Sequence, residues 1–390
     1  MKILFLSQRV PYPPNRGDKI STWRTIERMQ RQHEVRIIAF ADDAADLKAA
    51  EDLRGMGFQV STFRSRGKLR ALPWLLTNKP ITLGAYGSKA LQAEVDKYIH
   101  EVDMAYAFSS SMGAFFLHHQ HLPRVMHFAE LDSDKWRQYA LKKRFPASWI
   151  YQREYRTLFA FEKQLAAVTV DNIFCTSLEK RIFEERIPGL PATTMRNGID
   201  LKRHQPDYDS AEAGHMVFVG VMDYYPNVEG CLWFCKQILP EIQAQVPGAR
   251  FSIVGSHPTP EIQRLGQLEG VEVTGFVDDP RDWLRRGALS VAPLRIARGI
   301  QNKVLEAMAM GLPVVGTTSA TQGVEGQPGR DFLVEDEVGG QVEAICGLLR
   351  DPARARALGQ AGREFVEQEY DWEITLRPLD RLLERIEREL

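Results

Sequence analysis

The sequence predicts an α/β protein with two doubly wound domains, and three observations support this prediction. Short runs of β-branched and aromatic residues alternate with longer amphipathic stretches along the chain, which is typical of βαβ units and parallel sheets. The chain has 390 residues, and single hydrophobic cores stop growing at about 250–300 residues. A polar segment without apolar periodicity separates two sets of predicted strands.

The expected strands are short and apolar. Those of the first domain are KILFLS, HEVRIIAF, MAYAFS, RVMHFAE and NIFCTS. Those of the second are HMVFVG, RFSIVGS, VEVTGF, LSVAPL, PVVGT and DFLVED. In open α/β sheets ligands bind beyond the carboxyl ends of the strands, so functional residues are expected in the loops that follow each run.

The predicted domain limits follow from the same patterns. We expect an N-terminal domain over residues 1–198, a linker over 199–214 and a C-terminal domain over 215–370. The linker prediction rests on MRNGIDLKRHQPDYDSAEAGH, where Asn, Gly, Asp and Pro gather. Residues 371–390 are predicted to form one further helix. Four apolar residues share one side of it: Leu379, Leu382, Leu383 and Ile386.

Composition limits the classes of function. The chain is 44% hydrophobic and 26% charged, which is typical of globular proteins, and its net charge of -1 gives no global attraction to nucleic acid. Anion binding must therefore be local. The apolar run after Lys2 is too short for a signal peptide, and no run is long enough for a membrane span. We expect a cytoplasmic protein.

Cysteines and histidines do not predict a metal site. The four scattered cysteines are expected to be buried and unpaired: Cys175, Cys231, Cys235 and Cys346. The tract HHQH over 118–121 lacks an acidic or cysteine companion nearby, and we interpret it as a solvated helix end. The triplet Asp132-Ser133-Asp134 matches an Asp-x-Asp metal motif only superficially, and helix capping by Asp132 and Ser133 explains it at least as well.

The loop after the first predicted strand has some features of an anion-binding site. Gly17 permits a close backbone approach, and it is flanked by Arg16 and Lys19 at the start of a predicted helix. Asp18 could cap that helix, so an ordinary Pro-rich loop with two solvated charges is equally compatible with the sequence. Neither a G-x-G-x-x-G fingerprint nor a Walker loop is present. We therefore expect no cofactor.

The stretch RGIQNKVLEAMAMGLPVV, residues 298–315, carries the strongest signal. Lys303 and Glu306 share one helix face in its early turns, where the helix dipole disfavours a cation. The placement makes sense if a nucleotide diphosphate binds to Lys303, to arginines 295 and 298 and to free backbone N–H groups. Glu306 would then accept hydrogen bonds from neighbouring hydroxyls such as those of ribose. A weak surface pair between Lys303 and Glu306 is the alternative.

The pattern G-x3-K-x2-E-A-M-A-x-G-x-P-V-V resembles the nucleotide-sugar motif of retaining glycosyltransferases with the GT-B fold, family 4. The resemblance runs from the Pro-rich opening loop through NGID, residues 197–200, to the closing helix. It is closest to the sugar transferases associated with exosortase (PEP-CTERM) and exopolysaccharide loci, which also look like FVGVMDYYPNVEG, residues 218–230. It implies two Rossmann-like domains facing a cleft, with the C-terminal helix crossing back to an acceptor-binding N-terminal domain.

The resemblance also implies roles for individual residues. Glu306 would bind the ribose, and the helix start would bind the diphosphate through Gly299, Ile300, Gln301 and Lys303. Many family members carry a glutamate at the position of Arg298, which leaves the donor sugar open. The loop that contains Asp223, which we expect to bind the donor, lacks the arginine and lysine of many relatives. We infer that other cations supply this charge: Arg295, Arg298, Lys303 and Arg16.

The implied acceptor side lies in HFAELDSDKW, where His127, Glu130 or Asp132 could touch the sugar or the acceptor hydroxyl. The basic and apolar segment FRSRGKLRALPWLL, residues 63–76, is compatible with peripheral contact with the inner membrane or with an ordinary surface helix.

We expect a metal-independent hexosyltransferase that moves sugar from a nucleotide sugar to a glycan or polyprenyl-linked acceptor and binds no nucleic acid. A nucleotide-sugar epimerase and a degenerate nucleotide-sugar binding subunit are the alternatives.

Overall fold

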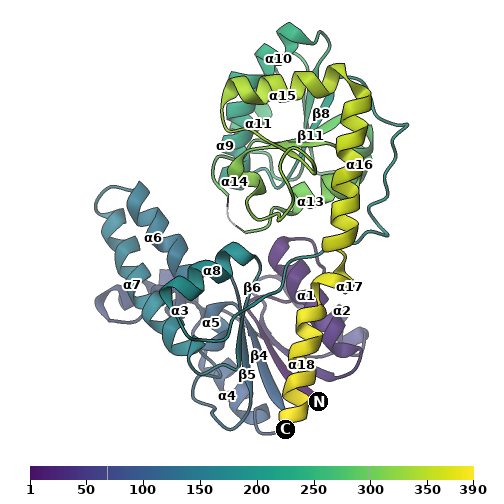
Figure 1. Cartoon of the computed structure of the whole chain (residues 1–390). Coiled ribbons are helices and arrows are strands. Elements are labelled where there is room, and N and C mark those ends of the chain that lie inside the picture. Colours follow the sequence, from purple (N-terminus) through teal and green to yellow (C-terminus); the bar gives the residue numbers. More distant parts are fainter. Residues whose placement is uncertain (68, 298) are drawn as a thin grey trace. The chain divides into compact units, whose positions relative to one another are not determined.

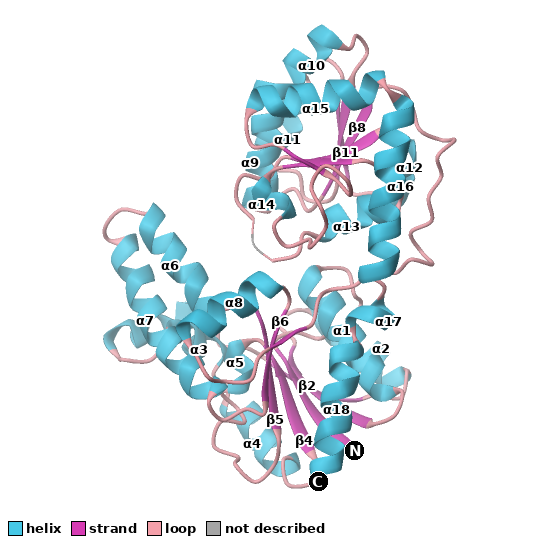
Figure 2. Ribbon diagram, in the orientation of Figure 1, coloured by secondary structure: helices cyan, strands magenta, loops and turns pink. Residues whose placement is uncertain are grey.

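The computed structural model describes residues 1–67, 69–297 and 299–390, which form two compact units (Figure 1). The first unit comprises residues 1–196 and 376–390, and the second comprises 197–375. Residues 199–214, expected as a linker, group with the second unit. Each unit contains a parallel sheet with helices around it (Figure 2). The fold class is therefore α/β with two Rossmann-like domains, as predicted.

The sheet of the first unit has seven parallel strands in the order β3-β2-β1-β4-β5-β6-β7. Their bounds are β1 Lys2–Ser7, β2 Glu34–Phe40, β3 Gln59–Phe63, β4 Met104–Phe108, β5 Arg124–Ala129, β6 Asp171–Phe174 and β7 Thr193–Thr194. Five of these match predicted strands. The two missed strands lie at the sheet edges, where β3 is only partly buried and β7 has two residues, so neither carries a strong apolar pattern.

Helices connect these strands. Their bounds are α1 Gly17–Gln30, α2 Ala44–Gly55, the 3-10 helix η1 Leu69–Leu76, α3 Ile81–Tyr86, α4 Lys89–Tyr98, α5 Ser110–Gly113, α6 Asp132–Lys142, α7 Ala147–Ala166 and α8 Ser177–Arg186. Helices α6 and α7 form a hairpin between β5 and β6.

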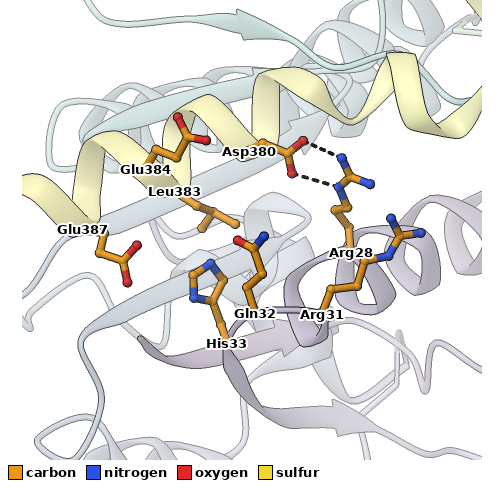
Figure 3. Close-up of a pocket in the computed structure, with 8 residues that line it drawn as sticks. All are labelled: Arg28, Arg31, Gln32, His33, Asp380, Leu383, Glu384 and Glu387. Atoms are coloured by element: carbon orange, nitrogen blue, oxygen red, sulfur yellow. Dashed lines mark hydrogen bonds and ion pairs between the residues drawn. The ribbon is translucent and has the colours of Figure 1, made fainter.

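The C-terminal segment forms two helices where one was predicted: α17 Trp372–Thr375 and α18 Arg377–Glu389. Pro378 lies in the first turn of α18, where a missing N–H is tolerated but a preceding helix cannot continue. The four apolar residues of the predicted side are buried in the first unit. Arg28 of α1 donates two hydrogen bonds to Asp380 of α18, at 2.9 and 2.7 Å (Figure 3).

The sheet of the second unit has six parallel strands in the order β10-β9-β8-β11-β12-β13. Their bounds are β8 His215–Val219, β9 Arg250–Val254, β10 Val271–Gly275, β11 Leu289–Ala292, β12 Val314–Gly316 and β13 Leu333–Val334. All six match predicted strands. The helices are α9 Tyr225–Trp233, the π-helix η2 Phe234–Ile238, α10 Leu239–Gln245, α11 Pro260–Leu265, α12 Pro280–Arg286, α13 Asn302–Ala309, α14 Thr318–Thr321, α15 Val338–Arg350 and α16 Pro352–Glu369.

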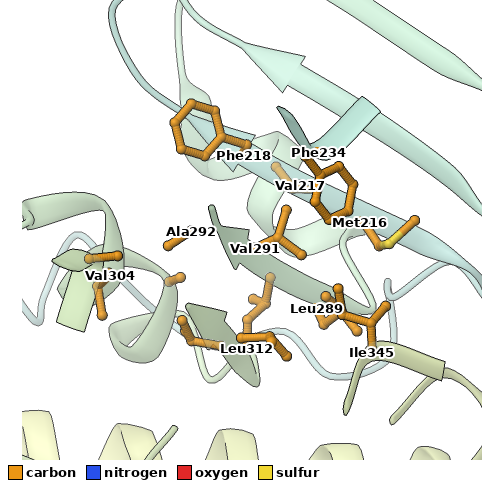
Figure 4. Close-up of a cluster of buried hydrophobic side chains, with 14 of the residues drawn as sticks. Met216, Val217, Phe218, Phe234, Leu289, Val291, Ala292, Val304, Leu312 and Ile345 are labelled. Atoms are coloured by element: carbon orange, nitrogen blue, oxygen red, sulfur yellow. The ribbon is translucent and has the colours of Figure 1, made fainter. Parts of the chain in front are cut away.

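The core of the second unit joins this sheet to its helices. Phe218 of β8, Val291 of β11 and Val304 of α13 belong to one buried cluster, as Figure 4 shows. Burial of each such side chain contributes about 1.5–3 kcal/mol. The core therefore fixes the strand ends that precede the candidate site. All four cysteines are buried and unpaired, as predicted. Within the described ranges, no helix is both long and apolar enough to span a membrane.

Candidate functional site

Helix α13 starts close to the carboxyl end of β11. Gly299 has a φ of 62°, a left-handed conformation that favours glycine. Gly311 ends the helix with a φ of 72°, and its N–H donates to the carbonyl of Met308 at 2.9 Å, which confirms the predicted C-terminal glycine. At the other end, the side chain of the N-cap residue Gln301 makes no capping hydrogen bond.

Lys303 lies in the first turn of α13 and is largely withdrawn from solvent. Its Nζ donates a hydrogen bond to Oδ1 of Asn227 at 2.8 Å and lies 5.0 Å from the ring centroid of Phe218. Both partners are neutral. Burial lowers the pKa of Lys303 from 10.5 to about 8, so the ammonium is still mostly charged at neutral pH. The Lys303 side chain is therefore a half-buried cation whose hydrogen-bond partner carries no charge.

Glu306 follows one turn later on the same helix face. Burial raises the pKa of its carboxyl, while His204 and Lys303 act in the opposite direction. The hydrogen bond of Lys303 goes to Asn227, so the pair is not the surface ion pair that the sequence left as an alternative. The arrangement places an acceptor carboxylate one turn behind a cation.

Side chains of helix α9 bind two of the predicted cations of the second unit, Lys303 and Arg295. Oδ1 of Asn227 accepts the hydrogen bond from Lys303, and Nδ2 of Asn227 donates to the carbonyl of Val221 at 2.9 Å. Glu229 forms an ion pair with Arg295, whose guanidinium lies 5.3 Å from the ring centroid of Trp233. Arg295 is therefore already partnered by a carboxylate, which weakens its predicted role in diphosphate binding. Sequence reasoning assigned no role to these three α9 side chains.

The loop after β11 is held by side chains that follow β12. The hydroxyl of Thr317 donates to the carbonyl of Leu294. The hydroxyl of Ser319 donates to the carbonyl of Arg295 at 3.3 Å, and Nε2 of Gln322 donates to that of Ala297 at 3.0 Å. The backbone that leads towards α13 is thus fixed at three points. Arg298 lies outside the described residues.

The loop after β8 approaches Lys303 through a glycine. A Cβ on Gly220 would lie 2.7 Å from Nδ2 of Asn227 and 3.5 Å from Cε of Lys303. Gly255 packs against the same backbone, because a Cβ there would lie 1.7 Å from the carbonyl oxygen of Gly220. Asp223, predicted to bind the donor, is exposed in this loop. The backbone of Gly220 therefore comes close to Lys303, and Gly255 packs against that backbone.

The predicted cations of the first unit, Arg16 and Lys19, are each paired with a carboxylate. Helix α1 begins at Gly17, slightly earlier than expected, and Asp18 pairs with Arg16 at 2.7 Å and with Arg9 at 2.6 Å. Lys19 pairs with Asp46 at 3.0 Å. The side chain of Asp18 does not cap the helix: the N-cap residue is Arg16, without a side-chain cap bond. The expected capping by Asp18 is wrong, because this carboxylate is bound by two arginines.

His127 lies in the interior of the first unit. It is 0% exposed, Oη of Tyr106 lies 2.8 Å from its Nδ1, and the ring of Phe108 packs against it with centroids 4.6 Å apart. Burial lowers the pKa of His127 to about 3, so the ring is neutral. The structure does not present this side chain to a sugar or an acceptor hydroxyl.

Two further sequence interpretations are corrected near His127. Helix α6 begins at Asp132, and its N-cap residue Leu131 makes no side-chain cap bond; Asp132 accepts a hydrogen bond from Ser110 at 2.9 Å, and the N–H of Ser133 donates to Oε1 of Glu162 of α7 at 3.1 Å. The HHQH tract does have an acidic companion, because Nε2 of His119 lies 2.9 Å from Asp96 of α4. Among the described residues, no group of His, Cys, Asp or Glu is arranged to hold a metal ion.

Known proteins resemble parts of this chain. Residues 213–351, which contain α13 and α9, match the family described as Glycosyl transferases group 1. A GDP-mannose-dependent monoacylated alpha-(1-6)-phosphatidylinositol monomannoside mannosyltransferase of Corynebacterium glutamicum is 29% identical over 49% of this chain and 55% of its own length. A glycogen synthase of Mycobacterium tuberculosis is 26% identical over 58% of this chain and 57% of its own. The matches thus span just over half of these relatives.

Solved structures resemble the whole chain. Sucrose-phosphate synthase of Thermosynechococcus elongatus has a TM-score of 0.73 at 17% identity and covers 100% of both chains. HepE of Anabaena, solved in complex with UDP, also has a TM-score of 0.73 at 17% identity and covers 99% of this chain and 100% of its own. At this identity the likeness shows the fold alone. That fold is GT-B, as the resemblance in the sequence implied.

Proposed function

We propose that this chain is a retaining glycosyltransferase that moves a sugar from a nucleotide diphosphate sugar to a glycan or lipid-linked acceptor. One observation carries the proposal: Lys303 is charged and half-buried at the start of α13 and, among the described residues, donates its hydrogen bond to the neutral Asn227, with Glu306 one turn behind it. A diphosphate is the chemical class that satisfies this cation, and a ribose diol is the class that satisfies the carboxylate. The donor is a substrate, and the proposal requires no cofactor.

The residues of the second unit would stabilise the leaving group. As the bond between the sugar and the diphosphate breaks, negative charge develops on the departing phosphate oxygens. A fixed cation in a confined site stabilises this charge more than water does, and Lys303 is such a cation. Diphosphate contacts are assigned to Gly299, Ile300 and Gln301 at the start of α13, and the role of Arg298 stays a prediction.

Retention of anomeric configuration and membership of family 4 rest on the motif around Lys303 and Glu306. The family mechanism uses a phosphate oxygen of the donor to take the acceptor proton, so the proposal needs no metal ion and no basic side chain for that step. It assigns no proton transfer to His127, whose ring is buried and neutral.

The acceptor class is supported by the names of relatives. They include a lipopolysaccharide core biosynthesis mannosyltransferase of Rhizobium meliloti, 28% identical over 46% of this chain and 58% of its own. Together with the phosphatidylinositol mannoside enzyme, this favours an acceptor on a lipid or polysaccharide. The likeness to exosortase-associated transferases supports a place in exopolysaccharide synthesis, in the cytoplasm.

A sugar-transfer assay tests the proposal. The protein is incubated with UDP-glucose or GDP-mannose labelled in the sugar, with glycan and polyprenyl-linked acceptors. We expect label in the acceptor with the donor's anomeric configuration, and a loss of at least about 100-fold in Lys303→Ala. Lys19→Ala, a cation at the other predicted cradle, serves as the control.

Other outcomes identify the alternatives. Conversion of donor without any acceptor would favour a nucleotide-sugar epimerase. Donor binding without turnover of any kind would favour a degenerate binding subunit.

A further inference from the structure

We propose that the tip of the α6–α7 hairpin in the first unit docks on an anionic phospholipid bilayer. The hairpin tip is defined as residues 141–149, from the end of α6 to the first turn of α7. This surface is separate from the candidate site, which belongs to the second unit. The inference does not depend on the proposed sugar transfer.

Three large apolar side chains of the hairpin tip face solvent. Leu141 is 74% exposed, Phe145 is 81% exposed and Trp149 is 53% exposed. Exposed apolar residues occur singly on most proteins, but three within one short segment mark an interaction surface. Trp in particular is enriched where apolar lipid meets polar headgroups.

The charge around these side chains has one sign. From Lys135 to Gln152 the sequence contains five basic residues and no acidic residue. One of the five, Arg137, is paired with Asp134, which lies just before this range, at 2.7 Å. Lys143 and Arg144 lie inside the hairpin tip with exposed side chains. Each cation close to an anionic membrane contributes attraction that salt screens. The combination of exposed apolar groups and uncompensated positive charge fits an anionic lipid surface better than an uncharged partner.

The hairpin behind the tip is rigidly packed. Trp136 of α6 stacks on Tyr151 of α7 with ring centroids 5.5 Å apart, and Tyr139 lies 6.0 Å from Trp136 and 5.9 Å from Tyr151. These rings lock the two helices together, so the exposure of the tip is not a consequence of loose packing. A preordered surface loses little conformational entropy when it binds.

Helix α7 also anchors a second exposed apolar segment. The buried Arg153 donates hydrogen bonds to the carbonyls of Trp74 at 2.6 Å and Lys79 at 3.1 Å. Between these two anchors, Leu76 is 93% exposed. Arg153 lies one helical turn after Trp149, so the segment around Leu76 reaches α7 close to the hairpin tip. The sequence suggested membrane contact for residues 63–76 alone, and the structure adds the tip.

Vesicle flotation of the full-length chain tests the proposal. The vesicles contain either phosphatidylcholine alone or phosphatidylcholine with phosphatidylglycerol. We expect at least about tenfold stronger binding to the phosphatidylglycerol vesicles, decreasing as salt is added. Phe145→Gln with Trp149→Gln should lower binding at least about tenfold. Leu47→Gln with Met56→Gln, which change Leu47 of α2 and its C-cap residue Met56, 52% and 50% exposed, should leave it unchanged.

Charge reversal separates the electrostatic part. Lys143→Glu with Arg144→Glu should abolish the preference for phosphatidylglycerol, whereas Lys48→Glu with Lys89→Glu, which changes the net charge equally, should retain it. Equal binding of the tip and control variants would overturn the proposal, as would no binding of the parent to either vesicle. Concentration-dependent self-association that Phe145→Gln removes would also overturn it, because a second copy would then be the occupant.

Discussion

Helices α1 and α13 both carry cations at their N-termini, yet the structure treats these cations differently. In α1, Arg16 pairs with Asp18 and Lys19 pairs with Asp46. In α13, Lys303 is bound to the amide of Asn227 and lies beside the ring of Phe218. The two sequences looked alike as anion cradles, but each predicted cation of α1 is paired with a carboxylate, whereas Lys303 donates its hydrogen bond to a neutral amide.

The difference indicates when a cation at a helix N-terminus is available to bind an anion. A cation that is paired with a carboxylate attracts an anionic ligand only weakly, because the pair has no net charge. A cation fixed by neutral dipoles in a poorly solvated place keeps its charge and gains energy when an anion arrives. Substitutions in the two helices should therefore have different effects on nucleotide binding.

Removal of the charge should separate the two helices. Lys303→Ala should weaken binding of the matching nucleoside diphosphate by about 3 kcal/mol, the upper range for charge-assisted hydrogen bonds. Lys19→Ala should change it by less than about 0.5 kcal/mol, because Lys19 is already paired. Isothermal titration calorimetry measures both. Comparable losses in the two variants would contradict the contrast between α1 and α13.

Removal of the carboxylate should also weaken binding. Glu306→Ala should cost about 2 kcal/mol of nucleotide affinity, because the ribose hydroxyls lose a charged acceptor. A 2′-deoxy nucleotide should bind the parent more weakly but bind Glu306→Ala about as well as the ribonucleotide does. Isothermal titration calorimetry measures the affinity of both nucleotides for the parent and for Glu306→Ala. A full 2′-hydroxyl preference in the variant would remove Glu306 from the site.

Nucleotide affinity should fall as pH rises through about 8. The pKa of Lys303 is lowered to about 8, so its ammonium is present below that pH and lost above it. Binding needs the charged form, so the dissociation constant should rise above pH 8 by up to about tenfold per unit, or about 1.4 kcal/mol. Lys303→Arg should flatten this profile, since arginine stays charged. A flat profile in the parent would mean that Lys303 does not face the ligand.

The positioning of Lys303 should matter less than its charge. Asn227→Ala leaves the cation in place but removes its hydrogen-bond partner, so nucleotide affinity should fall by about 1 kcal/mol. Asn227→Asp should lower affinity further, because a carboxylate would convert this site into the neutralised arrangement of α1. Isothermal titration calorimetry of the two variants measures their nucleotide affinities. An unchanged affinity in Asn227→Asp would contradict the argument about neutral partners.

The smallest effect is expected in the first unit. Asp18→Asn frees Arg9 and Arg16 from their ion pairs and removes an acidic residue from the first turn of α1. Stability should fall by about 0.5–1 kcal/mol, from the lost pairs and the helix dipole. Urea denaturation measures this change. Nucleotide affinity should stay unchanged, and an increase would revive α1 as a binding element.

Much of the fold follows from the sequence, because buried parallel strands have strong apolar patterns. The strands at the first unit's edges, β3 and β7, lack that pattern and were missed. The sequence predicted the part of the candidate site that lies on one helix, because Lys303 and Glu306 share a face of α13. The side chains that bind the predicted cations lie far from them in the sequence. Asn227 is 76 residues from Lys303, and Glu229 is 66 residues from Arg295.

The most direct measurement is a thermal-shift series with UDP, GDP, ADP, dTDP and CMP on the parent, Lys303→Ala, Glu306→Ala and Lys19→Ala. A ligand at a hundred times its dissociation constant adds about 2.7 kcal/mol of stability. The account predicts a shift with one nucleotide in the parent and in Lys19→Ala, and no shift in the two α13 variants. A shift that survives in Lys303→Ala and Glu306→Ala would contradict the assignment of the donor site to α13.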